Sequence, residues 1–222
     1  MNVRFKLMAA LTLGMMQGMV CAAEAPIMST AGDAAAGQAK SAMCVACHGA
    51  DGNSPSPAFP SIAGQNATYI AKQLQDYKSG KRVNALMVGI VAALSPEDMK
   101  NLAAFYAAQP VKAQATKDGG VAADVQALVE HGRVLYQTGR AAEGSAPAVA
   151  ACSACHGEAG FGNAPAAYPA LRAQHAAYTE LMLKSFRESS RNNDLNAVMR
   201  QAGQALTDDD IRALAAYASS MK

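Results

Sequence analysis

The stretch Cys44-Val45-Ala46-Cys47-His48 decides how this chain folds, because it recurs with a single change as Cys152-Ser153-Ala154-Cys155-His156. Cys-x-x-Cys-His is the pattern at which c-type haem is attached to a protein. The two thiols form thioethers with the porphyrin, and the histidine lies beneath the iron as its proximal ligand. Since the pattern occurs at the same place in two repeated units, the sequence predicts two covalently bound haem c groups. The predicted attachment residues are Cys44, Cys47, Cys152 and Cys155, and the predicted proximal metal ligands are His48 and His156.

Pairs of cysteines spaced in this way also bind zinc or act as redox dithiols. Neither alternative explains the histidine that follows each pair directly. A zinc site would also have to join ligands from two separate repeat units. Haem attachment is therefore the better interpretation of both motifs.

Residues 1–23 have the pattern of a secretory signal peptide. Arg4 and Lys6 form a basic start, and residues 7–20 form an apolar run that is too short to span a bilayer comfortably. Cys21-Ala22-Ala23 then supplies small residues for cleavage. A membrane anchor is the alternative. Removal of this segment leaves no cysteine outside the haem motifs, and export predicts a periplasmic protein.

The charge balance excludes one class of partner. The chain has 19 Lys and Arg residues and 17 Asp and Glu residues. Loss of Arg4 and Lys6 with the signal peptide makes these numbers equal, and residues 24–110 and 111–222 are each balanced. We therefore predict no nucleic-acid partner, and long-range electrostatic steering is expected to be weak.

Outside the haem motifs, the two halves of the chain match again. Residues 59–60 correspond to 168–169, 65–69 to 174–178, 82–84 to 191–193, and 94–98 to 206–210. The second half differs by an insertion at 138–150 and by three extra residues before Met199. The sequence thus predicts a duplicated domain, with an N-terminal domain at 24–110, a linker at 111–124 and a C-terminal domain at 125–222.

Each domain is predicted to be helical. Residues 67–78 have the apolar spacing of an amphipathic helix, and residues 95–98 have the Ser-Pro-acid pattern of a helix start. A helix over 34–43 leads into the first haem motif. Gly37, and Gly132 in the second domain, are expected to let this helix pack closely on the last helix. A domain this small needs a buried porphyrin to supply part of its apolar core.

Iron with one histidine needs a second axial ligand or an open site, and this choice separates an electron carrier from a catalyst. Met87 and Met199 occupy matched positions between predicted helices, each after an Arg-x-Asn segment. A loop there can cross the distal face of the haem, so we predict that both methionines are metal ligands. Met99 and Met182 lie at helical spacing with apolar neighbours, which is typical of core residues.

The two remaining histidines are weaker ligand candidates. His131 is expected at the surface near a helix start, and His175 corresponds to Asn66 in the first copy. Pro60 and Pro169 follow the proximal histidines at similar spacing, and their carbonyls are predicted to accept the Nδ1–H of those histidines; an ordinary loop proline is the alternative. Four side chains could reach haem propionates, although exposed surface positions explain them nearly as well: Tyr69, Tyr178, Arg82 and Arg191.

Several segments carry a family resemblance: 31–34, 44–54, 59–65 and 82–87 in the first half, and 152–157, 168–171 and Met199 in the second. Through these segments the chain resembles the dihaem cytochrome c4 family, and the resemblance covers essentially everything after the signal peptide. The resemblance implies an all-α fold of two tandem class I cytochrome c domains, related by internal duplication and meeting near a pseudo-twofold axis. It implies ligation by His48 with Met87 and by His156 with Met199. The second copy has Arg172-Ala173 where the first has Ala63-Gly64, so the resemblance does not define the shape of the second haem pocket.

The resemblance also implies a periplasmic carrier, not an enzyme, that passes electrons from a cytochrome bc complex towards a terminal oxidase. Peripheral association with the membrane stays open. One alternative is a dihaem oxidoreductase of the peroxidase or thiosulfate-oxidising type, which would need one displaceable ligand. The other is a haem subunit of a larger dehydrogenase, which would have a permanent partner.

Overall fold

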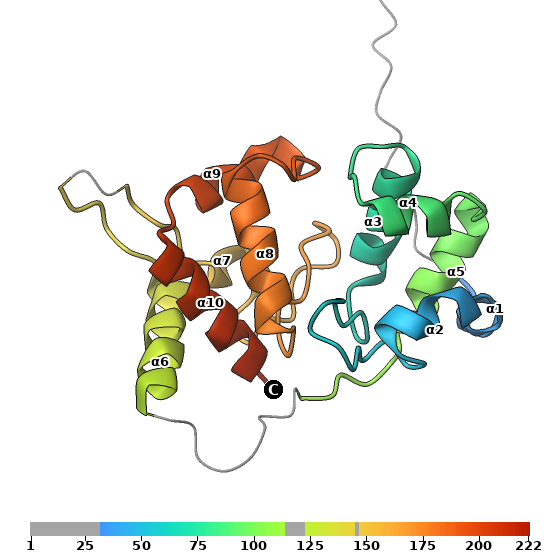
Figure 1. Cartoon of the computed structure of the whole chain (residues 1–222), viewed down its shortest axis with the longest axis horizontal. Helices are drawn as coiled ribbons and strands as arrows, with labels where there is room; N and C mark the ends of the chain where they lie inside the picture. Colours follow the sequence, from blue (N-terminus) through green and yellow to red (C-terminus); the bar gives the residue numbers. More distant parts are fainter. Residues whose placement is uncertain (1–31, 114–122, 145–146) are drawn as a thin grey trace, which may run out of the picture.

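The structure is a computed structural model that describes residues 32–113, 123–144 and 147–222. The predicted signal peptide and residues 114–122 of the predicted linker lie outside the described residues. Figure 1 shows two helical halves side by side. Within the described ranges there is no β-strand, only isolated antiparallel bridges between Arg140 and Val149 and between Asn163 and Tyr168. The predicted all-α fold is therefore confirmed.

The two halves follow the same order of helices. The first contains α1 (Ala34–Lys40), α2 (Ala42–His48), α3 (Ala67–Lys78), α4 (Ala85–Val91) and α5 (Pro96–Ala107). The second contains α6 (Ala123–Thr138), α7 (Ser153–His156), α8 (Ala176–Arg187), the 3-10 helix η1 (Leu195–Ala197), α9 (Val198–Gln204) and α10 (Asp208–Ser220). The helix predicted over 34–43 is divided, because the chain turns at Ser41 between α1 and α2.

A close helix crossing organises each half. A Cβ atom at Gly37 of α1 would collide with the Asn101 carbonyl and would lie 2.8 Å from Phe105 Cβ on α5. A Cβ atom at Gly132 of α6 would collide with the backbone of α10 in the same way and would lie 2.9 Å from Tyr217 Cβ. The predicted role of the two glycines is confirmed, because only a residue without a side chain permits this approach.

Matched capping boxes begin the last helix of each half. The Ser95 hydroxyl accepts the Asp98 N–H on α5, and the Asp98 carboxylate accepts the Ser95 N–H. Thr207 and Asp210 make the same reciprocal bonds on α10. Such boxes satisfy two helix N–H groups that would otherwise lack partners.

Each half has its own hydrophobic core. The first contains Ile70, Ala71, Tyr77, Val91, Leu94, Met99, Leu102, Ala103, Phe105 and Tyr106, and the second contains Leu135, Tyr136, Val149, Leu206, Ile211, Leu214 and Met221. Met99 is buried as predicted. Met182 is not part of either cluster; its sulfur accepts hydrogen bonds from Arg82 and Arg191, so it lies where the two halves meet.

Candidate haem sites

The first Cys-x-x-Cys-His motif forms most of α2, which ends at His48. This histidine is buried, and its Nδ1–H donates to the carbonyl oxygen of Pro60 at 2.8 Å. In the second half α7 ends at His156, which is also buried and donates to Pro169 at 2.9 Å. The predicted role of the two proline carbonyls is confirmed. Each bond fixes the ring and leaves Nε2 available for a metal.

Burial disfavours the charged form of both imidazoles. It lowers the pKa of His48 and of His156, and the bonds to the proline carbonyls offset only part of this effect. The neutral form that burial favours has the lone pair that ligation requires. Both rings therefore have the orientation and burial expected of proximal haem ligands.

No disulfide joins the four motif cysteines, and all four are partly buried. Burial raises the pKa of the Cys44 thiol, and it raises the pKa of Cys152 to about 11. Redox dithiols depend instead on a lowered thiol pKa. The two pairs lie in different halves of the molecule, on α2 and α7, so they do not form one four-cysteine zinc site. Within the described ranges, no group of three or more His, Cys, Asp or Glu residues could hold a metal ion.

Met87 lies on α4 rather than on a loop, which corrects the predicted local structure. Asn84 precedes this helix, and its Oδ1 accepts the backbone N–H of Met87 at 3.1 Å. An Asn at the cap position satisfies one free N–H and starts the helix there. Met87 is partly buried and packs against the core of the first half. Its helix is thus fixed from within its own half.

Met199 is also helical, on α9, but the approach to it differs. The longer segment before Met199 contains η1, in which Asn196 and Ala197 have left-handed φ angles of 52° and 57°. Asp194 closes this turn by accepting the Arg200 N–H at 3.0 Å and the Arg200 Nε–H at 2.8 Å. Arg200, which follows Met199 directly, is therefore held by the Asp194 carboxylate at the start of this turn.

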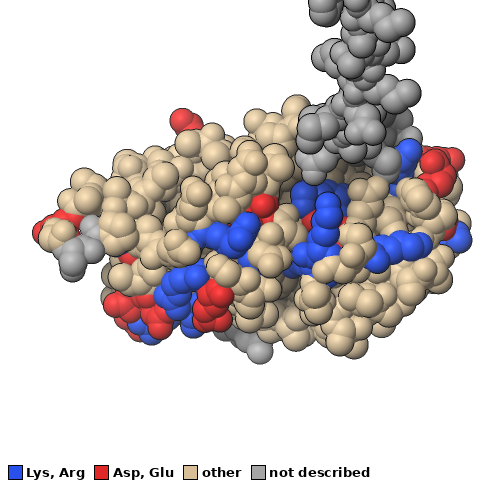
Figure 2. Space-filling view, turned by 90° about the horizontal axis from the view of Figure 1, so that it is seen from above, with Lys and Arg blue, Asp and Glu red and all other residues tan. Residues whose placement is uncertain are grey.

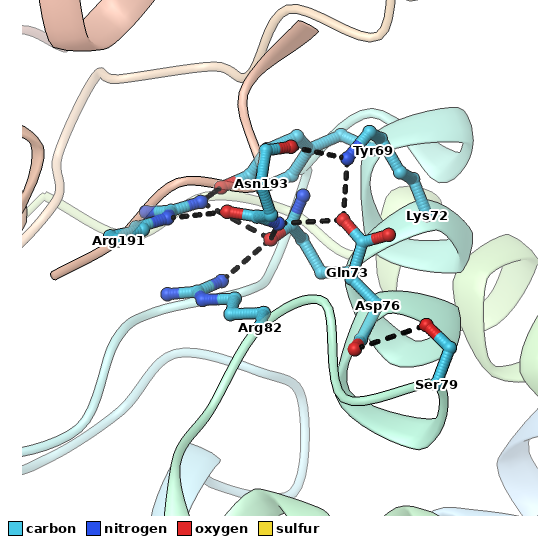
Figure 3. A network of polar contacts seen from close by, with 8 residues as sticks. All are labelled: Tyr69, Lys72, Gln73, Asp76, Ser79, Arg82, Arg191 and Asn193. Carbon is cyan, nitrogen blue, oxygen red and sulfur yellow. Dashed lines mark hydrogen bonds and ion pairs between the residues drawn. The ribbon is translucent and has the colours of Figure 1, made fainter. Parts of the chain in front are cut away.

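Side chains of α3 and α8, and of the segments that follow these helices, form contacts between the two halves. Arg82 donates to the Tyr178 hydroxyl at 3.0 Å, and Arg191 donates to the Tyr69 hydroxyl at 2.9 Å. Both guanidinium groups also reach the Oε1 of Gln73, at 2.8 and 3.2 Å (Figure 3). The alternative that these four residues lie exposed at the surface is therefore wrong, because each arginine of the repeat pairs with the tyrosine of the other copy.

This network holds more positive than negative charge. Among the residues drawn in Figure 3, three are cations, Lys72, Arg82 and Arg191, whereas Asp76 is the single carboxylate. Burial would raise the pKa of Tyr69, but the positive charges of Arg191 and Arg82 outweigh it and lower that pKa. Buried guanidinium groups need anionic partners. Carboxylates of a bound porphyrin would fit this requirement.

The loop before Met199 is attached to the first half through Asn193. Its Nδ2 donates to the Asp76 carboxylate at 2.6 Å and to Gln73 at 3.0 Å, and its carbonyl accepts from Lys72 Nζ at 2.8 Å (Figure 3). In the first half the corresponding residue, Asn84, caps α4 instead. The matched asparagines thus have different roles.

Lys and Arg side chains gather over the middle of the molecule in the view of Figure 2. A cleft of about 440 Å³ lies beside the Asn193 contacts and is lined by Lys72, Asp76, Lys81, residues 192–196 and Arg200. Two of its cations are paired within the cleft, because Lys72 contacts Asp76 and Arg200 contacts Asp194. The cleft is polar and open to solvent.

His131 and His175 have structural roles. His131 lies within α6, half exposed, with Nε2 at 3.5 Å from the Asp210 carboxylate. His175 is buried at the start of α8, and its Nε2–H donates to the Ser54 carbonyl of the first half at 3.0 Å. Sequence reasoning missed the neighbouring Gln65 and Gln174, which also bond across the halves. The available signal was their identity at matched positions of the repeat.

Two small helical domains, each with a buried histidine behind a cysteine pair, define a two-domain c-type cytochrome. The family model for cytochrome c matches residues 34–108 and 141–222. Cytochrome c4 of Pseudomonas aeruginosa is 43% identical over 188 residues, covering 84% of this chain and 88% of that protein. The crystal structure of reduced recombinant cytochrome c4 from Pseudomonas stutzeri matches with a TM-score of 0.78 at 39% identity, covering 86% of this chain and all of that one.

The chain belongs to the cytochrome c4 family. It is an electron-transfer cytochrome of two cytochrome c domains with two covalently bound haem c groups, one at each Cys-x-x-Cys-His motif. A protein named thiosulfate dehydrogenase electron acceptor, from Stutzerimonas stutzeri, is 39% identical over 175 residues and covers 78% of this chain and 76% of its own length. None of the helices in the described ranges is both long and apolar enough to cross a membrane.

Proposed function

We propose that this protein is a periplasmic dihaem carrier that receives electrons from a cytochrome bc complex and delivers them towards a terminal oxidase. It would act as a carrier and not as an enzyme. The observation that carries the proposal is the matched geometry of His48 and His156, both buried and bonded through Nδ1 to a proline carbonyl.

The proposal includes the residues of both haem sites. Cys44 and Cys47 would attach the first haem and Cys152 and Cys155 the second, and the irons would be held by His48 with Met87 and by His156 with Met199. A bound haem supplies the one-electron change between ferric and ferrous iron, and methionine sulfur favours the ferrous state. The proline carbonyls orient the imidazole rings and increase their basicity. Arg82 and Arg191 supply positive charge for the propionates.

We further propose that residues 1–23 direct export, that 24–110 and 125–222 are the two domains, and that 111–124 link them. The basic start and short apolar run of the first segment support this location. Equal numbers of basic and acidic residues after cleavage make short-range contacts more important than steering for partner binding. We propose no nucleic-acid partner, and peripheral membrane contact is compatible with the absence of a spanning helix in the described ranges.

Another electron donor has specific support. The relative named thiosulfate dehydrogenase electron acceptor has 39% identity to this chain. A thiosulfate-oxidising enzyme is therefore a second candidate for the donor. In that case the chain would still be a carrier with two filled coordination sites, and the donor alone would differ.

Optical spectroscopy of the mature, haem-loaded protein tests the proposal. We expect two haems per chain from the pyridine haemochrome, a long-wavelength methionine–ferric band for both haems, and no binding of carbon monoxide after reduction. If one haem lacks the band and binds carbon monoxide readily, the protein is a dihaem enzyme and the carrier function is wrong. Co-purification of a stoichiometric flavoprotein would instead identify a subunit of a larger dehydrogenase.

A further inference from the structure

The peptide group that accepts each proximal histidine has a second partner in the opposite domain. The carbonyl oxygen of Pro60 accepts the His48 Nδ1–H, and the N–H of the same peptide, which belongs to Ser61, donates to Gln174 Oε1 at 2.9 Å. A continuous chain of hydrogen bonds therefore runs from the histidine of the first domain to a side chain of the second.

The second domain repeats this arrangement in the opposite direction. The carbonyl oxygen of Pro169 accepts the His156 Nδ1–H, and the N–H of Ala170 donates to Gln65 Oε1 at 2.8 Å. Each proximal histidine is thus linked, through one peptide, to a glutamine of the other domain. The two chains are related by the internal repeat, since Gln65 corresponds to Gln174.

Both glutamine side chains are held at three points. The Nε2 of Gln174 donates to the Ser61 carbonyl at 2.9 Å, and Oε1 also accepts the N–H of His175 at 3.0 Å. Gln65 makes the corresponding bonds to the Ala170 carbonyl at 2.9 Å and to the Asn66 N–H at 2.9 Å. Gln65 is 8% exposed, so water does not compete freely for these bonds. The amide orientation that accepts from the peptide is therefore fixed.

Hydrogen bonds in such a chain polarise one another, by roughly 10–30% per bond in condensed-phase estimates. An acceptor on the Ser61 N–H makes the Pro60 carbonyl oxygen more negative, and this oxygen then draws more strongly on the Nδ1 proton. The imidazole becomes a more basic ligand. A more basic proximal ligand stabilises ferric iron over ferrous iron and lowers the reduction potential.

We propose that Gln174 is a positioning residue for the first haem and Gln65 for the second, so that each domain tunes the potential of the other. The proposal rests on the function proposed above, in which His48 and His156 are the proximal ligands. Replacement of Gln174 by Met removes the acceptor, and the potential of the first haem rises. Replacement by Glu provides a stronger acceptor, and that potential falls.

The test is a potentiometric titration of haem-loaded Gln174→Met, Gln174→Glu, Gln65→Met and Gln65→Glu. Nuclear magnetic resonance signals of the axial methionines assign each transition to one haem. At a fixed applied potential we expect roughly a threefold change in the reduced-to-oxidised ratio of the haem in the opposite domain, which corresponds to about 30 mV for one electron. The Met and Glu variants should shift the reduction potential of that haem in opposite directions. The Nδ1–H resonance of the opposite proximal histidine should move as well.

Asn66→Ala is the matched control, because Asn66 crosses to the carbonyls of Phe161 and Tyr168 but does not bond the Pro169–Ala170 peptide. We expect a much smaller shift for this variant. Equal shifts at both haems, a larger shift in the mutated domain, or the same sign for Met and Glu would overturn the proposal. If Gln174→Met does not fold, Gln174→Glu, which keeps an acceptor, decides alone. A wild-type protein without two methionine-ligated haems would instead refute the proposed function.

Discussion

The helices that carry Met87 and Met199 are fixed in different ways, although the two domains descend from one repeat. In the first domain Asn84 caps α4 and bonds the Met87 N–H directly. In the second, the matched Asn193 reaches across to Asp76, and Asp194 within an inserted turn takes over the local role. One support of the segment before the proposed ligand Met199 therefore comes from the neighbouring domain, whereas the support of Met87 lies within its own domain.

The difference shows how a duplicated domain becomes asymmetric without a change of fold. The two motif histidines are matched in both copies, because each is buried and donates to a proline carbonyl, at 2.8 and 2.9 Å. The segment before the proposed methionine ligand differs in length, backbone conformation and attachment. Differences between the two haems should consequently originate mainly from the methionine side and from the contacts between the domains.

The largest expected effect comes from removal of each methionine. Met87→Ala should open the first iron and Met199→Ala the second, and each should lower the potential of its own haem by on the order of 0.1 V, because axial ligands set haem potentials over roughly 0.8 V. Potentiometry and carbon monoxide binding measure both effects. If Met199→Ala leaves both potentials and carbon monoxide binding unchanged, the ligand assignment is wrong.

The next effect concerns the carboxylates of the capping boxes. Asp210 is almost fully buried and accepts two bonds from Arg140 at 2.8 and 2.9 Å, whereas Asp98 is more exposed and pairs with Lys40 at 3.2 Å. Arg140→Ala should lower the free energy of unfolding by about 2–3 kcal/mol, since it takes the guanidinium partner from a buried carboxylate. Lys40→Ala should cost less than about 1 kcal/mol. Denaturant unfolding of both variants measures the difference, and equal losses would contradict it.

A smaller effect is expected where the repeat places different residues in the left-handed region. Gly64 has φ 62°, and its counterpart Ala173 has φ 53°. A residue with a Cβ atom is destabilised by roughly 1–2 kcal/mol in this conformation. Glycine avoids that strain but loses more conformational entropy on folding, so Ala173→Gly should stabilise the protein by about 0.5–1 kcal/mol. Gly64→Ala should destabilise it by about 1–2 kcal/mol, since the new Cβ also meets Val111. Thermal unfolding with opposite signs for the two variants is the expected result.

The smallest effect is on acid stability. Bonds from the Ser95 N–H and hydroxyl, with Lys40, lower the pKa of Asp98 to about 2 from its usual 3.8. A carboxyl with a lowered folded-state pKa stabilises the fold above its unfolded value, and this contribution disappears as the pH falls from 3.8 towards 2. Asp98→Asn should therefore flatten the decline of stability in that range, as measured by circular dichroism. An unchanged slope would show that the partly buried Asp98 carboxylate is not linked to folding.

The sequence predicted the parts of each site that depend on local pattern. The proximal histidines and their proline carbonyls lie close together in the chain, and the repeat confirms each spacing with a second copy. Gly37 and Gly132 were predictable because a helix crossing needs a residue without a side chain. The helical state of Met87 was not predicted, because an asparagine after a polar segment is typical of a loop as well as of a helix start.

Contacts between the copies were beyond sequence reasoning. A repeat shows that Arg82 matches Arg191 and that Tyr69 matches Tyr178, but it does not show that each arginine bonds the tyrosine of the other copy. Near-twofold placement of the domains creates these exchanged pairs. The same applies to Gln65 and Gln174, whose identity in both copies was visible while their partners were not.

The positive charge between the domains has a consequence for the strength of their association. Arg82 and Arg191 both reach Gln73 and Met182, which are neutral, so neither guanidinium group gains an opposite charge from these partners. An anion that entered this network would supply that charge and would therefore hold the two domains together more firmly.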